Sequence, residues 1–184
     1  MSFFTRDAVA LAQKLIGCRL CLGGVGGVII ETEAYTLEDP ASHSFRGRTA
    51  RNASMFGAPG DVYVYRSYGL HWCLNIVADE PGSAVLLRAI EPDTGLAEMC
   101  ARRQTEKLAL LCAGPGRLCQ ALGITGEHNG LSIEALPFQF EASETEAHLL
   151  VGPRIGVTRA TDIAWRFGRV GSRLLSRNFP KQQA

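Results

Sequence analysis

Apolar residues near the start of the chain recur three and four positions apart across residues 8–15, the spacing of one buried helix face. Thr5 stands before this stretch and is expected to cap the first turn of the helix. Residues 18–22 and 28–35 follow as two apolar, strand-like stretches. The glycine-rich residues 23–27 between them predict a hairpin turn. They do not predict a phosphate-binding loop, because a strand follows where such a loop needs a helix.

The rest of the chain predicts a β-rich domain with a few short helices. Residues 36–51 are polar and predict irregular structure. Strands that come first and helices inserted later favour an α+β fold. We therefore expect a single domain over residues 1–184, with a curved, mostly antiparallel sheet, flanking helices and a protruding β-hairpin. The further strands are expected at 62–66, 71–78 and 85–90, the helices at Leu96–Arg103 and 116–122, and the weakest strands at 149–151 and 155–157.

The composition agrees with a soluble domain of this kind. Hydrophobic residues make up 46% and charged residues 20% of the 184 residues, as in ordinary globular proteins. The longest apolar runs are far shorter than the roughly 20 residues that span a bilayer. Charges also interrupt the N-terminus before any signal-like apolar run. We expect a cytoplasmic protein with no membrane partner, associated with the nucleoid if its source is bacterial.

Six cysteines are spread along the chain. Cys18 and Cys21 have the CxxC spacing, but no second CxxC or HxxxH completes a zinc set. Positions three apart on a strand also face opposite sides, which is wrong for shared ligation. Cys112 and Cys119 are the alternative second half of a zinc site. Buried free thiols are the favoured interpretation, so we expect neither a metal nor a cofactor.

The distribution of charge is more informative than the formal net charge of +1. Residues 120–150 carry five acidic side chains and no Lys or Arg, whereas residues 151–184 carry six Arg and one Lys against one Asp. Arg46, Arg48 and Arg51 form a second basic cluster. Arginine suits bidentate contacts to phosphate, which favours a nucleic-acid partner. The same charges fit a solvated protein face equally well.

Two carboxylates lie close together on the strand expected at 28–35. With a period of two, Glu31, Glu33 and Tyr35 share one face of this strand, and the residues between them share the other. Such a pair can hold a general base near an aromatic wall. The alternative is a solvent-exposed strand face, which alternation alone favours.

Aromatic residues crowd the next expected hairpin. Tyr63 and Tyr65 lie on one face of its first strand, and Tyr68 precedes Gly69 at its tip. A large aromatic at an exposed tip gains little from core packing, and wedges of this kind enter the base stack to replace an extruded nucleotide. The alternative is that Tyr68 folds back onto its own hairpin.

Six motifs occur together and in order: ETEAY at 31–35, ASHS at 41–44, RTARNASMF at 48–56, the run 63–75, LLRAIEP at 86–92 and GPGRLCQAL at 114–122. With them the chain closely resembles the 3-methyladenine DNA glycosylases of the alkyladenine (AAG/MPG) type, from about Asp7 to Gly156. The resemblance implies a monomeric base-excision-repair enzyme without a cofactor. It would flip alkylated or deaminated purines (3-methyladenine, 7-methylguanine or hypoxanthine) from double-stranded DNA and hydrolyse the N-glycosidic bond, leaving an abasic site. No lysine falls within the motifs, so we expect a monofunctional enzyme with no Schiff base and no lyase activity.

The resemblance also implies roles for individual residues. Glu33 matches the glutamate that activates the attacking water, and Arg88 matches an arginine beside that water. Tyr68 matches the side chain that is intercalated into DNA. The residues expected at the walls of the base pocket are Tyr35, His43, Tyr65 and Asn75. Those expected to contact the DNA backbone are Arg46, Arg48, Arg51 and Arg66.

The chain departs from the family pattern in two places. Gly168 stands where an aromatic residue usually follows Phe, and Arg173 and Leu174 stand where a Pro-aromatic pair usually follows Gly-Ser. The resemblance therefore does not extend to the C-terminal wall of the pocket or to the exact range of bases. Arg66, beside the expected wedge, replaces an aliphatic residue and is predicted to contact a phosphate.

Two other functions fit parts of the sequence. Residues 118–125 look like the middle of a helix-turn-helix, which predicts a DNA-binding regulator without catalysis. The glycine-rich stretch that follows is poor in base-reading side chains, which disfavours this interpretation. Alternatively, Glu31 and Glu33 form the carboxylate pair of a small-nucleoside hydrolase, since retaining hydrolysis needs carboxyls about 5–5.5 Å apart. The arginine-rich segments favour a polymer over a monomeric nucleoside.

Overall fold

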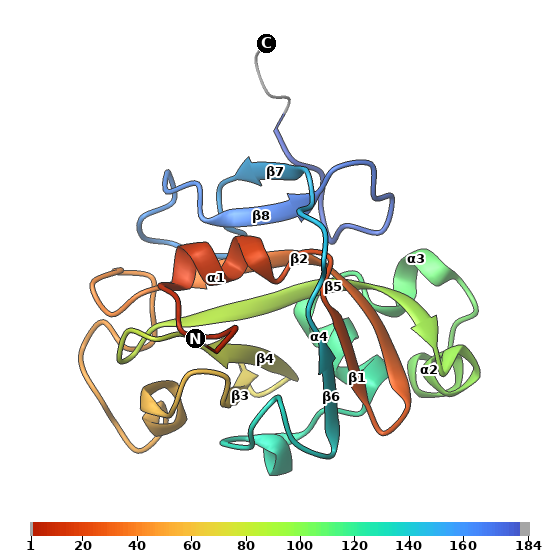
Figure 1. Cartoon of the computed structure of the whole chain (residues 1–184), viewed down its shortest axis with the longest axis horizontal. Coiled ribbons are helices and arrows are strands. Elements are labelled where there is room, and N and C mark those ends of the chain that lie inside the picture. Colours follow the sequence, from red (N-terminus) through yellow and green to blue (C-terminus); the bar gives the residue numbers. More distant parts are fainter. Residues whose placement is uncertain (1, 181–184) are drawn as a thin grey trace.

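The strand that carries the two glutamates lies at the centre of the sheet. In the computed structural model, which describes residues 2–180, β2 (Val25–Tyr35) pairs along one edge with β5 (Ala84–Thr94). Its other edge pairs with β1 (Arg19–Leu22) near the start of β2 and with β8 (Arg166–Arg169) near its end. Figure 1 shows β8, in blue, brought beside β2, in red, although the two are far apart in sequence.

The remaining strands extend the sheet on both sides of β2. The order along the sheet is β3-β4-β5-β2-β1-β6, and β7 joins through β8. All of these pairs are antiparallel, which confirms the expected α+β fold with an antiparallel sheet. The expected hairpin at the tyrosines is also confirmed. The strands not yet described are β3 (Val62–Ser67), β4 (His71–Val77), β6 (Phe138–Glu141) and β7 (Leu149–Gly152).

Short helices cover the sheet. Helix α1 (Ala8–Lys14) packs against β2 and β5, and Figure 1 shows it lying along the middle of the sheet. Helix α4 (Pro115–Leu122) packs against β4, β5 and α2, and it buries Leu118 and Leu122. The other helical segments are α2 (Leu96–Arg103), α3 (Leu108–Leu111), and the 3-10 turns η1 (Ala53–Phe56) and η2 (Gly126–His128).

The two faces of the sheet have different interiors. The main core lies under α1 and α4, where Val62, Leu74 and Ile76 from the β3–β4 hairpin are fully buried. Their neighbours in sequence point to the other face, since side chains alternate along a strand. There Met55, Tyr63, Val77 and Ala84 form a smaller core, against which Tyr35 and Tyr65 pack. The aromatic residues of the motifs thus gather on the face opposite the main core.

The start of the chain differs from the expectation in two details. Asp7, not Thr5, caps α1: its carboxylate accepts the N–H of Ala10 at 2.8 Å. The hairpin turn is shorter than expected, because β2 already begins at Val25. Gly26 and Gly27 belong to the strand, where a Cβ atom would lie 2.1 Å from a carbonyl oxygen of the neighbouring strand. These two glycines permit close strand packing instead of forming the turn.

The end of the chain differs more. The strand expected at 149–151 exists as β7, but the one expected at 155–157 is wrong. Residue Ile155 donates its N–H to the carboxylate of Glu33 at 2.7 Å, so this backbone group is not available to a strand ladder. Strands β6 and β8 and helix α3 were not expected; each is four residues long, and so short an element shows at most a weak period.

All six cysteines are free, and five of them are buried, which confirms the interpretation as interior thiols. Among residues 2–180, no three His, Cys, Asp or Glu side chains are placed to hold a metal ion together. Within the same residues, every helix is too short or too polar to cross a bilayer.

The capping interaction of α1 is open to a direct test. We expect Asp7→Ala to lower the free energy of unfolding by about 1 kcal/mol, because the N–H of Ala10 loses its acceptor. Thr5→Ala is the matched control and should change the stability by less than about 0.5 kcal/mol, as for an ordinary surface substitution. Urea unfolding followed by circular dichroism measures both. Equal losses in the two variants would contradict the assignment of Asp7 as the cap.

Candidate active site

Glu33 is fully buried near the end of β2 and is held by three neighbours. The hydroxyl of Tyr35 donates to its Oε2 at 2.9 Å, and the backbone N–H of Ile155 donates to its Oε1 at 2.7 Å. The guanidinium of Arg88 lies 3.2 Å from Oε2. Each carboxylate oxygen can accept about two hydrogen bonds, and among the described residues Oε1 has one donor, the N–H of Ile155.

Glu31, two positions earlier, is also fully buried but has a different environment. Its Oε1 accepts from Arg88 at 3.2 Å and from Arg166 at 2.7 Å. Ser176 donates to the same carboxylate through its hydroxyl at 2.7 Å and through its backbone N–H at 2.5 Å. Two carboxylates and two guanidinium groups therefore form one compact cluster whose formal charges balance.

Arg88 joins the two glutamates. Burial favours its neutral form, but the charges of Glu33 and Glu31 outweigh this effect and raise the pKa of Arg88 above its ordinary value. The guanidinium therefore stays charged. The position of Arg88 depends on irregular pairing between β2 and β5. Ile30 on β2 and Arg88 on β5 have no partner in this ladder, so each forms a bulge. Such bulges re-aim side chains next to functional sites.

The bulge at Ile30 also limits the expected alternation along β2. From Glu31 to Tyr35 the period of two holds, and the hydroxyl of Thr32 points the opposite way, to a carbonyl of α1. Before the bulge the phase changes, so Ile29 instead of Ile30 joins the main core. The alternative prediction, that this strand face is exposed to solvent, is wrong, because both glutamates on it are completely buried.

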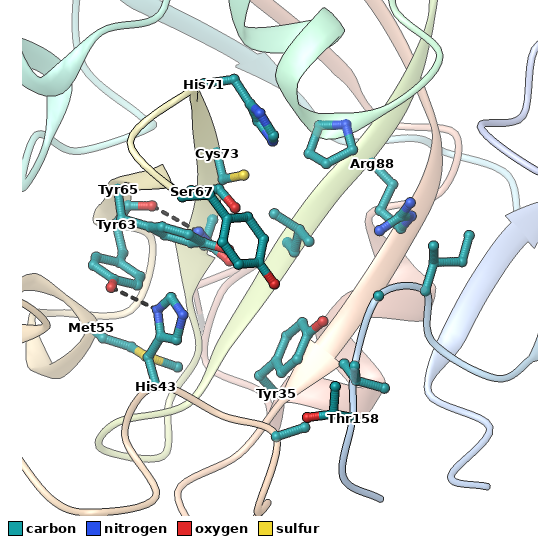
Figure 2. Close-up of a pocket in the computed structure, with 18 of the residues that line it drawn as sticks. Tyr35, His43, Met55, Tyr63, Tyr65, Ser67, His71, Cys73, Arg88 and Thr158 are labelled. Atoms are coloured by element: carbon teal, nitrogen blue, oxygen red, sulfur yellow. Dashed lines mark hydrogen bonds between the residues drawn. The ribbon is translucent and has the colours of Figure 1, made fainter. Parts of the chain in front are cut away.

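A cavity of about 700 Å³ lies next to Glu33 on the aromatic face of the sheet. Three residues that hold Glu33, namely Tyr35, Arg88 and Ile155, also line this cavity, so the carboxylate lies directly behind its wall. Figure 2 shows Tyr35, Arg88 and Thr158 on one side of the cavity and the hairpin residues on the other. Its aromatic and imidazole walls are Tyr35, His43, Tyr63, Tyr65, Tyr68 and His71.

The wall opposite Tyr35 is a packed aromatic group. The rings of Tyr63 and Tyr65 stack at 5.3 Å, and the edge of the His43 ring meets Tyr65 at 4.4 Å. His43 Nδ1 lies 3.0 Å from the hydroxyl of Tyr63, a hydrogen bond drawn in Figure 2. Burial raises the pKa of Tyr63 to about 12, so this hydroxyl remains protonated. The expected pocket residues Tyr35, His43 and Tyr65 are thus brought together around one cavity.

Asn75 is the fourth expected pocket residue and also lines the cavity. It is buried on β4, directly opposite Tyr63 on β3, and its amide donates to the carbonyl of Tyr63 at 3.0 Å. This hydrogen bond fixes the orientation of the amide. A rigid polar group in the pocket wall can favour or exclude particular exocyclic groups of a base.

Tyr68 occupies the tip of the β3–β4 hairpin. Its side chain is 87% exposed, so it does not fold back onto its own hairpin. Its backbone has a φ of 48°, in the left-handed region that residues other than glycine rarely adopt, and Gly69 follows with a φ of 70°. This tight turn holds a large aromatic ring in solvent at the rim of the cavity.

The arginines expected at DNA are all exposed, but only one lines the cavity. Arg51 does so, whereas Arg46 and Arg48 lie in the same irregular segment outside the lining. Arg66 stacks over the ring of Trp72 at 5.8 Å, on the outside of the hairpin. All four side chains are therefore accessible to a partner.

The basic C-terminal region divides into two groups that sequence reasoning did not separate. Arg154 and Arg166 are buried: Arg154 pairs with Asp39 and lies 4.7 Å over the ring of Tyr35, and Arg166 holds Glu31. Arg159 remains exposed at the cavity. The roles of Asp39 and Ser176 were also missed, because no local pattern connects them to partners more than a hundred residues away.

Both alternative functions conflict with this arrangement. Helix α4 ends at Leu122 and is followed by the 3-10 turn Gly126–His128, not by a second helix that could enter a DNA groove. A glycosidase-type pair needs both carboxyls beside the sugar. Four donors, from Arg88, Arg166 and Ser176, already occupy the Glu31 carboxylate, so it is committed to its own contacts.

Comparison with known proteins places this geometry in a family. The family model described as "Methylpurine-DNA glycosylase (MPG)" matches residues 2–173, which is most of the chain. The chain belongs to the methylpurine-DNA glycosylase family. Enzymes of this family are hydrolases that act on N-glycosyl bonds in DNA, and the resemblance seen in the six motifs is thereby confirmed.

Curated relatives match this chain over nearly its whole length. One from Agrobacterium fabrum is 55% identical over 99% of this chain and 94% of its own length. Others come from Rhizobium etli, with 54% identity over 97% and 88%, and from Nitrosospira multiformis, with 53% identity over 96% and 92%. All three carry the name "Putative 3-methyladenine DNA glycosylase".

The charge state of His43 is testable. Burial lowers its pKa below the ordinary value of 6.5, and the charge of Arg51 lowers it further. Protonation therefore requires a more acidic solution, and the ring is neutral at pH 7. We expect the His43 resonance, identified by its loss in His43→Asn, to titrate below pH 6.5 in an NMR experiment. A midpoint above 6.5 would contradict the lowered pKa of His43.

Proposed function

We propose that this protein flips an alkylated or deaminated purine out of duplex DNA and hydrolyses its N-glycosidic bond with a water activated by Glu33. One observation carries the proposal: a fully buried carboxylate with a remaining acceptor position lies directly behind the wall of an aromatic cavity. A water bound to Oε1 would lie between the carboxylate and a nucleotide in that cavity. Glu33 then takes a proton from the water as it attacks C1′ of the deoxyribose.

The contacts of Glu33 suit this role. The N–H of Ile155 and the hydroxyl of Tyr35 fix its orientation, so the acceptor position on Oε1 is pre-organised. Burial raises the pKa of Tyr35, and the charge of Glu33 adds to this effect, so the hydroxyl stays a donor. Arg88, 3.2 Å from Oε2, holds this side of the carboxylate in place, and the negative charge of Glu33 faces the positive charge that develops on the sugar.

The walls of the cavity suit a purine. An N3- or N7-alkylated purine is cationic, and the faces of Tyr35 and Tyr65 attract a cation placed between them. Such a base also leaves readily, so a held water and a general base suffice. Hypoxanthine is neutral and leaves after protonation of the departing purine. Damaged or mispaired bases cost less to unstack, which contributes to selectivity.

The exposed residues around the cavity suit duplex DNA. Tyr68 at the hairpin tip has the size and exposure of a wedge that fills the space of the flipped nucleotide. Arg46, Arg48, Arg51 and Arg66 are accessible to phosphates, and their contacts would release counterions and make binding sensitive to salt. Among residues 2–180, no lysine lines the cavity, which supports hydrolysis without a Schiff base and without strand cleavage.

A single substitution tests the catalytic assignment. We expect Glu33→Gln to lower the single-turnover rate of hypoxanthine release from a duplex by about 10²–10⁴-fold, because an amide cannot take a proton from water. Damage-specific binding should remain, since the shape of the side chain is kept. The reaction is followed by release of free base, without metal or nucleotide, and a panel with 3-methyladenine, 7-methylguanine and ethenoadenine ranks the substrates.

Glu134→Gln is the matched control for this experiment. Glu134 is exposed and does not line the cavity, so the same chemical change should leave the rate within about 2-fold of the unmodified protein. A Glu33→Gln variant that releases base at the normal rate would remove Glu33 from the mechanism. Base release from free nucleosides in preference to duplexes would instead point to the nucleoside hydrolase.

The wedge role of Tyr68 has its own measurement. We expect Tyr68→Ala to reduce the fluorescence rise of a 2-aminopurine placed beside the lesion, because the flipped state loses the ring that replaces the nucleotide. The single-turnover rate should fall less than in Glu33→Gln. Leu136→Ala removes another large side chain, 81% exposed and outside the hairpin, and serves as the control. Undiminished flipping in Tyr68→Ala would contradict the role.

A further inference from the structure

The chain after β8 returns to the buried charge cluster. Ser176 reaches Glu31 with both its hydroxyl and its backbone N–H, at 2.7 and 2.5 Å. The same hydroxyl oxygen accepts from Arg88, at 3.4 Å from Nε and 3.3 Å from Nη2. Ser176 thus contacts both Arg88 and Glu31. Arg88 in turn lies between Glu31 and Glu33 and contacts both carboxylates.

The segment that carries Ser176 is anchored on β8. Arg166 donates to the carbonyl of Arg177 at 2.5 Å and to that of Asn178 at 3.4 Å, while it also binds Glu31. Its guanidinium lies 3.8 Å over the ring of Phe179. A buried arginine therefore connects this segment to Glu31 by a second route.

Two glycines provide the space for Phe179. A Cβ atom on Gly168 would lie 2.6 Å from its ring, and one on Gly152 would lie 3.1 Å from it. These glycines come from the paired strands β8 and β7, where Gly168 lies opposite Leu150 and Gly152 lies opposite Arg166. A larger side chain at position 168 would occupy this space from the strand itself. Here the space is filled by the chain beyond residue 173, where the match to the family model ends.

We propose that residues 174–180 form a strap that positions Arg88 against Glu33, with Ser176 as the positioning residue and Phe179 as its anchor. The inference rests on the proposed role of Glu33. Without the strap, Glu31 loses two of its four donors, and Arg88 loses the hydroxyl oxygen that helps to orient its guanidinium. Arg88 is then free to turn toward Glu31 and away from Glu33, which leaves the general base less well oriented.

The position of the strap determines which step it affects. Neither Ser176 nor Phe179 lines the cavity, so neither would touch a flipped base. The strap should therefore act on the chemical step and leave the binding of DNA unchanged. A residue that only supported the fold would change the amount of active protein, not the rate constant of the folded fraction.

The first experiment compares Ser176→Ala with Ser176→Thr. We expect Ser176→Ala to lower the single-turnover rate of hypoxanthine release about 10-fold, because small displacements of a catalytic group carry penalties of this order or larger. Ser176→Thr keeps the hydroxyl and should stay within about 2-fold. The Kd for a duplex with a tetrahydrofuran abasic analogue should stay within about 2-fold in both. Equal rates for Ser176→Ala and the unmodified protein would overturn the proposal, as would equal losses in the two variants.

A double-mutant cycle tests whether the anchor and Ser176 act as one element. We expect Phe179→Ala to lower the rate by a similar factor, and the double variant to be no slower than Phe179→Ala alone. Factors that multiply would show that the two residues act independently and would overturn the strap. Should Phe179→Ala fail to fold, the comparison of Ser176→Ala with Ser176→Thr decides the question.

The outcomes separate this inference from the proposed function. If Glu33→Gln retains full activity, the role of Glu33 is wrong, whatever the Ser176 variants do. If Glu33→Gln is inactive and Ser176→Ala is unchanged, the strap alone is wrong. The predicted pattern is a severe loss in the first variant, an intermediate loss in the second and full retention in Ser176→Thr.

Discussion

The structure depends on the neutralisation of two carboxylates in the middle of a sheet. Glu31 and Glu33 are fully buried on β2, and they are matched by Arg88 from β5 and Arg166 from β8. An unpaired charge in a protein interior costs several kcal/mol, whereas a well-bonded pair approximately offsets the desolvation of its members. Three strands must therefore assemble before this arrangement becomes stable. The geometry of the site is thus tied to the folding of the sheet centre.

The two carboxylates are not equivalent, and the difference fits a structural role for Glu31 and the proposed catalytic role for Glu33. Glu31 accepts from two arginines and from both donors of Ser176. Glu33 has fewer donors and lies directly behind the cavity wall. The first is committed to structure by its contacts, while the second keeps capacity for a ligand. The irregular backbone at Ile155 contributes to this difference, because its N–H donates to Glu33 instead of pairing in a strand.

Arginine has two distinct functions in this protein. Arg88, Arg154 and Arg166 are buried and neutralise interior carboxylates, and Arg154 also stacks on Tyr35 at the edge of the cavity. Exposed arginines on the irregular segment and on the hairpin remain accessible to a polyanion. A planar guanidinium suits both settings, since it binds carboxylate or phosphate in the same bidentate way and stacks on aromatic rings. The count of basic residues in a region therefore overstates the charge that a DNA partner would meet.

Sequence patterns determined the elements whose signals are local. The period of two placed Glu31, Glu33 and Tyr35 on one face, the spacing of turns located the hairpin of Tyr68, and the six motifs identified the family. Only the tertiary structure decided that both glutamates are buried and that the residues after β8 return to them. Glu31 meets Arg166 and Ser176 across 135 and 145 positions of sequence. No period or propensity encodes such a contact, because it arises when the strands pack and the buried charges require partners.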